Sequence, residues 1–83
     1  MFINKTPKGL NNISGINISR YRKELGISQR ELADKLQLIG MDVDKNAIQR
    51  IECGKRFVTD IELISFAKVF EKTYEELLKI TED

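Results

Sequence analysis

Histidine and tryptophan are absent from this 83-residue sequence, and cysteine and proline occur only once each. Without histidine, and with Cys53 as its one thiol, the chain can assemble neither a typical zinc site nor an internal disulfide. No glycine-rich phosphate loop or calcium loop occurs, and the carboxylates show no pairing typical of an acid–base couple. We therefore predict that the protein has no metal, no cofactor and no catalytic residue, and that it is not an enzyme.

Long apolar runs are missing as well. No stretch approaches the roughly 20 apolar residues that a helix needs to cross a bilayer. Polar residues interrupt the segment from Met1 to Pro7 too early for a signal peptide. A lone unpaired cysteine fits a reducing compartment. We expect a cytoplasmic protein without a membrane partner.

A strong excess of either charge is also lacking, but the charges are unevenly distributed. Residues 1–58 hold eleven Lys and Arg against six Asp and Glu, a net charge of +5. Residues 59–83 hold three against seven, a net charge of −4, so that the whole chain carries +1. A surface that faces phosphates would belong to the basic part. Charge alone leaves open the alternative of ordinary solvated faces.

Several side chains are placed to cap the starts of helices. In a capping box, a Ser or Thr and a Glu three residues later each bond the other's backbone N–H. Three such boxes and one capping aspartate occur, at Ser28 with Glu31, Thr59 with Glu62, Thr73 with Glu76, and at Asp44. Gly26, Gly40 and Gly54 are suited to left-handed caps at helix ends. These signals predict five helices, at about 15–25, 28–39, 44–53, 59–71 and 73–80.

Apolar residues at helical spacing define the core, and we predict an all-α domain over residues 14–83 that follows a flexible arm at 1–13. The inward faces of the first three helices are Ile18, Tyr21 and Leu25; Leu32, Ala33 and Leu36; and Ile48 and Ile51. The helix at 59–71 is apolar over much more than one stripe, so the last helix or a second subunit must cover it. We predict a homodimer through the last two helices, around Phe66, Val69 and Tyr74.

The central signal is a helix, a turn and a second helix between Ile27 and Lys55. Three segments resemble the phage Cro/repressor-type (XRE-like) helix-turn-helix family: Leu25–Ala33, Ile48–Arg56 and Thr73–Leu78. The resemblance implies a compact, lambda-repressor-like fold of five helices, with the helix at 44–53 in the major groove of DNA. It also implies a sequence-specific transcription regulator, a repressor in our prediction, that binds a palindromic operator in double-stranded DNA as a homodimer.

The helix at 44–53 has the side chains that direct readout of bases requires. With Ile48 and Ile51 turned inward, Asn46, Gln49 and Arg50 fall on the opposite side, and Lys45 lies at its flank. Asn and Gln can bond adenine through a donor and an acceptor together, and Arg can bond guanine twice. We predict that these four side chains contact bases. The alternative is a merely solvated helix face.

Contacts to the DNA backbone are predicted at both ends of the motif. The free N–H groups at the start of the helix at 28–39 favour a phosphate beside Ser28, Gln29 and Arg30, and the family resemblance implies this role for Gln29. Lys55 and Arg56, which follow the Gly54 cap, are placed to contact phosphates at the far end. The alternative for Gln29 is an ordinary first-turn residue without a DNA role. The alternative for Lys55 and Arg56 is an ordinary solvated pair.

The resemblance further implies an ion pair between Arg22 and Glu52, which would join the first and third helices and fix the base-contacting helix. Two features depart from the family pattern. The segment Gln37–Asp42 makes the turn about five residues longer, so the second helix should be a turn longer, with Leu38, Ile39 or Met41 against the core. Cys53 lies on the DNA-facing side, either as a tolerated small residue or as a redox-sensitive one.

Two other functions remain open at this point. One is an antitoxin that represses its own operon and binds a toxin or another protein partner through the apolar surplus of the helix at 59–71. The other is a protein-interaction module that has the fold but does not bind DNA. A module of that kind has no need of Asn46, Gln49 and Arg50 together.

Overall fold

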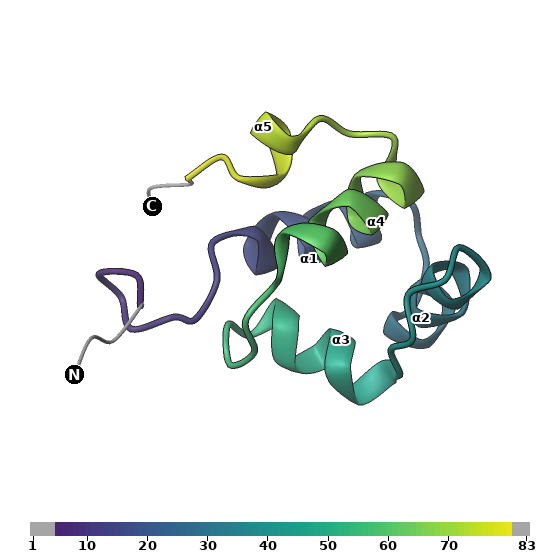
Figure 1. Ribbon diagram of the computed structural model, residues 1–83, viewed down its shortest axis with the longest axis horizontal. Coiled ribbons are helices and arrows are strands. Elements are labelled where there is room, and N and C mark those ends of the chain that lie inside the picture. The colour runs from purple at the N-terminus through teal and green to yellow at the C-terminus, as the bar shows by residue number, and fades with distance from the viewer. Residues whose placement is uncertain (1–4, 81–83) are drawn as a thin grey trace.

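The structure is a computed structural model and describes residues 5–80 (Figure 1). Five helices and no strand occur in this part of the chain: α1 (Ser14–Glu24), α2 (Gln29–Leu38), α3 (Lys45–Glu52), α4 (Asp60–Phe70) and α5 (Tyr74–Leu77). Both α1 and α2 contact α3, while α4 contacts α1, α2 and α5. The predicted all-α fold is therefore confirmed, and α3 lies at one edge of the molecule (Figure 1).

The predicted capping side chains are confirmed at four of the five helices. Ser28, Thr59 and Thr73 each accept a hydrogen bond from the backbone N–H of the glutamate three residues on, and that glutamate bonds back. Asp44 accepts from the N–H of Ala47 at 2.8 Å. Gly26, Gly40 and Gly54 all have the positive φ angles expected of helix-ending residues. The chain thus sets its helix starts and stops through contacts within a few residues.

The core contains most, but not all, of the predicted inward residues. Its buried apolar members are Ile18, Tyr21, Leu32, Ala33, Leu36, Met41, Val43, Ile48, Ile51, Phe66, Phe70 and Leu77. The assignment of Leu25 was wrong, because α1 ends at Glu24 and leaves this side chain 52% exposed. Ile27 packs against the core instead.

Residues on α4 also differ from the expected partner-facing set. Phe66 is 0% exposed and belongs to the core, so it cannot face a second subunit as predicted. The exposed apolar side chains of α4 are Ile61 and Ile64, and Tyr74 is exposed at the start of α5. The apolar surplus of α4 is therefore divided between the core and an outer face.

The last helix is shorter than predicted and ends at Leu77 rather than near residue 80. Beside this end, the buried Asn17 of α1 donates from Nδ2 to the carbonyls of Leu77 and Lys79, at 2.7 and 2.8 Å. These carbonyls are used by a side chain far away in the sequence. Asn17 therefore joins the end of α5 to α1.

Candidate nucleic-acid interface

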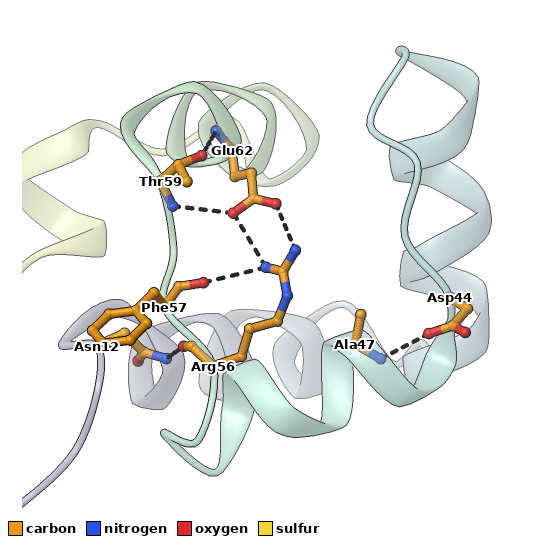
Figure 2. Close-up of polar contacts among 7 residues, drawn as sticks. All are labelled: Asn12, Asp44, Ala47, Arg56, Phe57, Thr59 and Glu62. Atoms are coloured by element: carbon orange, nitrogen blue, oxygen red, sulfur yellow. Dashed lines mark hydrogen bonds and ion pairs between the residues drawn. The ribbon is translucent and has the colours of Figure 1, made fainter.

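The outer face of α3 carries the side chains predicted to contact bases. Ile48 and Ile51 are completely buried on its inner face, whereas the four predicted residues are exposed. Those four are Lys45, Asn46, Gln49 and Arg50. The cap by Asp44 fixes the start of the helix (Figure 2). A short helix with one apolar side and one side of Lys, Asn, Gln and Arg is suited to hydrogen bonding with base edges.

The buried side of the interface contains the ion pair between Arg22 and Glu52. Arg22 donates from Nε to Oε2 at 2.7 Å and from Nη2 to Oε1 at 3.0 Å, and the two side chains are only 12% and 7% exposed. Arg22 also donates to the carbonyl of Ile27 at 2.9 Å. The hydrogen bond to Glu52 raises the pKa of Arg22 against the opposing effect of burial. The pair that the family resemblance implies is thus present and joins α1 to α3.

Gln29 extends this network to α2. Its Nε2 donates to Oε1 of Glu52 at 3.0 Å, so that the Glu52 carboxylate accepts bonds from two other helices. We call Arg22, Gln29 and Glu52 the α1–α2–α3 network. The family resemblance implies a phosphate contact for Gln29, and its bond to Glu52 was not predicted. The network fixes the position of α3 relative to the start of α2.

The three residues predicted beside a phosphate at the N-terminus of α2 have different surroundings. The Ser28 hydroxyl accepts from the N–H of Glu31 at 3.0 Å, and the Ser28 N–H donates to Oε1 of Glu31 at 2.9 Å. The hydrogen bond that the Ser28 N–H donates to the carboxylate, aided by the Ser28 side chain, lowers the pKa of Glu31. Gln29 is half-buried, and Arg30 is exposed. Arg30 is therefore the exposed cationic side chain of this group.

At the other end of the interface, Arg56 is engaged within the domain (Figure 2). Its Nη1 and Nη2 donate to Oε1 and Oε2 of Glu62 at 3.1 and 2.8 Å, and Nη1 also donates to the carbonyl of Phe57. Burial raises the pKa of Glu62, but bonds from Arg56 and Thr59 outweigh it, so the pKa lies below its usual value. Lys55, by contrast, is exposed. The two residues, predicted as equivalent, have different surroundings.

The longer turn between α2 and α3 packs two of its side chains into the core. Met41 and Val43 are buried, whereas Leu38 is 86% exposed, so Met41 alone of the three named candidates occupies the core. Gln37 donates from Nε2 to the carbonyl of Val43 at 2.6 Å. Cys53 is exposed, and its thiol lies 3.6 Å from the carbonyl of Arg50. The extra residues are accommodated without loss of the buried face of α3.

Sequence reasoning missed the two asparagines that precede α1. Asn12 donates from Nδ2 to the carbonyls of Ile51 and Arg56, at 3.0 and 2.7 Å. Asn11 donates from Nδ2 to the carbonyl of Lys55 at 2.9 Å. Both asparagines lie about 40 residues from their partners, and nothing in the local pattern predicts the pairing.

Two helices joined by a turn, with the second held by its buried face and polar on its outer face, define a helix-turn-helix domain. A family model described as helix-turn-helix matches residues 18–77. The chain therefore belongs to the helix-turn-helix family of the Cro/repressor (XRE) type, a family of DNA-binding transcription regulators. Searches of curated proteins and of solved structures gave no match.

Two further properties concern residues 5–80. None of their helices has the length and apolar content that a bilayer crossing requires. No group of three or more His, Cys, Asp or Glu side chains among them is arranged to hold a metal ion.

Proposed function

We propose that this protein is a transcriptional repressor that reads a palindromic operator through the outer face of α3. The observation that carries the proposal is the arrangement of this helix. Its inner face is fixed by two buried isoleucines and the α1–α2–α3 network, while Asn46, Gln49 and Arg50 remain exposed together. A rigid helix with free amide and guanidinium groups can distinguish base pairs in the major groove.

Phosphate contacts would position α3 without specifying sequence. At the start of α2, the capping box satisfies the N–H of Glu31 but not those of Gln29 and Arg30, the first N–H groups of the helix. An anion is favoured there by the helix dipole, and the exposed Arg30 adds a positive charge. At the end of α3 we assign the phosphate contact to Lys55 and not to Arg56, whose guanidinium Glu62 already neutralises.

A homodimer is part of this proposal, because a palindrome presents two identical half-sites. Its interface would use the outer face of α4 with the start of α5. Ile61 is 74% exposed, and Ile64 and Tyr74 are also exposed. A dimer bound across an operator would occupy the major groove at two places and exclude other proteins, which is the physical basis of repression.

The experiment is a selection of duplexes from a random DNA library, followed by measurement of affinity for the selected site and for shuffled sites. We expect an enriched palindrome, and Arg50→Ala should lose most of the preference at one base pair of each half-site. Arg20→Ala removes a guanidinium from α1 instead, where it bonds Asn17 and lies over the Tyr21 ring, and serves as the matched control. If no sequence is enriched, or if Arg50→Ala keeps the full preference, the proposal is wrong.

A further inference from the structure

The segment before α1 is attached to the end of α3 and to the loop that follows it. We call Leu10, Asn11 and Asn12 the strap. Besides the three side-chain bonds described above, the backbone N–H of Asn11 donates to the carbonyl of Gly54 at 2.8 Å. The strap therefore bonds four carbonyls in the six residues from Ile51 to Arg56.

Asn12 has a second function within this contact. Its Oδ1 accepts from the N–H of Gly15 at 2.8 Å, so one amide side chain joins the first turn of α1 to the last turn of α3 (Figure 2 shows its bond to Arg56). The two backbones approach closely here, and a Cβ on Gly15 would collide with the carbonyl oxygen of Ile51. Glycine is required at this position by the close approach rather than by its φ angle.

Leu10 and Gly54 form the apolar part of the same contact. A Cβ on Gly54 would lie 2.6 Å from Cδ2 of Leu10, so the leucine side chain covers the glycine directly. Gly54 also has a φ of +80°, which an L-residue adopts only with strain. The sharp turn after α3 is therefore covered on its outside by the strap.

The carbonyls at the end of a helix have no partner within the helix and need other donors. Here the strap adds a donor to the Ile51 carbonyl at the end of α3 and bonds the carbonyls of Gly54, Lys55 and Arg56 in the loop that follows. The residue at the centre of this three-residue loop is Lys55. We infer that Asn12, and to a smaller extent Asn11, are positioning residues for DNA binding, which hold Lys55 and the end of α3 in the geometry that a phosphate contact needs. This inference rests on the function proposed above and adds residues outside the helix-turn-helix motif to its site.

The chain contains a matched control for Asn12. Asn17 also donates from Nδ2 to two backbone carbonyls, but these belong to Leu77 and Lys79 at the end of α5. Asn12→Ala and Asn17→Ala therefore remove the same chemical group and the same number of donated bonds. Only the first releases the loop that carries Lys55.

The first measurement uses no DNA. Amide hydrogen exchange of Gly54, Lys55 and Arg56, whose N–H groups bond back to Ile51 and Arg50, reports whether the loop is ordered. Asn12→Ala should accelerate exchange at these three amides about tenfold or more, while Asn17→Ala should accelerate it at Leu77 and Leu78. Equal protection of the loop in Asn12→Ala and in the unmodified protein would overturn the inference.

The second measurement is the affinity for a mixed-sequence DNA duplex as a function of salt. Asn12→Ala should lower the slope of log K against log salt by about one unit, the loss of one phosphate contact. Lys55→Ala should lower it equally, and the double variant no further, because both changes remove the same contact. Asn17→Ala, compared below its melting temperature, should retain the slope of the unmodified protein. Asn11→Ala, which loses one bond only, gives a milder variant if Asn12→Ala does not fold.

The outcomes separate the two proposals. If the unmodified protein binds no duplex, the proposed function fails and the role of Lys55 fails with it, whatever the exchange data show. If the unmodified protein binds with a salt-dependent affinity and Asn12→Ala retains both slope and affinity, the strap inference alone is wrong. Additive effects of Asn12→Ala and Lys55→Ala would also overturn it.

Discussion

Helices α3 and α4 both contribute completely buried residues to the core, yet their outer faces differ. The outer face of α3 consists of Lys, Asn, Gln and Arg, whereas Ile61 and Ile64 are exposed on α4. They are also fixed differently, since α3 has a buried ion network in addition to its two core isoleucines, whereas α4 packs through Phe66 and Phe70. The core residues of a helix indicate how it is held in the domain, whereas its outer face indicates which partner it contacts. In our proposal, α3 contacts nucleic acid and α4 contacts protein.

The largest effect should come from breaking the network that holds α3. Arg22→Ala leaves the Glu52 carboxylate largely buried without its main partner, which should reduce the free energy of unfolding by about 2–4 kcal/mol. Urea denaturation measures this loss. Arg56→Ala, which breaks the more exposed pair with Glu62, is the control and should cost about 1 kcal/mol. Equal losses in the two variants would mean that the α1–α2–α3 network contributes no more to stability than the Arg56–Glu62 pair.

A charged substitution tests the outer face of α4. Ile61→Glu places a carboxylate on the proposed dimer surface and should weaken self-association at least about tenfold, while the exposed position leaves monomer stability nearly unchanged. Sedimentation equilibrium with and without operator DNA gives the association constant. Gln49→Glu makes the same kind of change on α3 and should impair DNA binding without altering self-association. A protein that is monomeric even on its operator would contradict the proposed interface.

In our proposal, the outer face of α3 contacts bases, and Lys55 in the loop that follows α3 contacts a phosphate. Arg50→Ala should cost about 1–3 kcal/mol on the selected site and relax the preference at one base pair. Lys55→Ala should weaken binding to all sequences alike. Fluorescence anisotropy on matched and mismatched duplexes separates the two. The distinction would be lost if Lys55→Ala changed sequence preference and Arg50→Ala did not.

Low pH should destabilise the protein at the start of α4, because Glu62 becomes protonated. Its pKa is lower in the folded protein than in the unfolded chain, so it contributes stability that is present above the unfolded value of 4.5 and is lost as the pH falls through the folded value. The pKa values of Glu31 and Glu76 are lowered in the same direction. Melting temperature measured from pH 7 to pH 3 should fall below about pH 5. Glu62→Gln should fall less steeply, and an identical profile would show that Glu62 does not contribute.

The smallest expected effect concerns the end of α4. Glu71 has φ 54° and ψ 44°, the left-handed conformation that glycine adopts without strain. Glu71→Gly should therefore raise the free energy of unfolding by about 0.5–1 kcal/mol, visible as a higher melting temperature. The end of α3 already has Gly54 in this conformation, and Gly54→Ala should have the opposite sign. A destabilised Glu71→Gly variant would indicate that the glutamate side chain has a favourable contact of its own.

The sequence predicted the features that depend on short spacing. The three capping boxes, the cap at Asp44 and the buried faces of α2 and α3 involve residues at most a few positions apart, and the structure confirms them. The Arg22–Glu52 pair came from the family resemblance, because its partners lie 30 residues apart.

The features that the sequence did not predict depend on distant backbone carbonyls. Asn12 and Asn17 bond carbonyls 39 to 62 residues away, and any residue type can supply a carbonyl, so no pattern of side chains marks the partner. The contacts of Asn17 with the end of α5 and the contacts of the strap were missed for this reason. The ion pair between Arg56 and Glu62 was missed because the capping role of Glu62 was considered alone.

The α1–α2–α3 network has a consequence for the calorimetry of complex formation. Because Glu52 already accepts bonds from Arg22 and Gln29 in the free protein, α2 and α3 form one rigid unit before any DNA arrives. No helix of this unit has to fold on association, so the heat-capacity change should match the apolar area buried between the two surfaces, without the additional negative contribution that coupled folding brings.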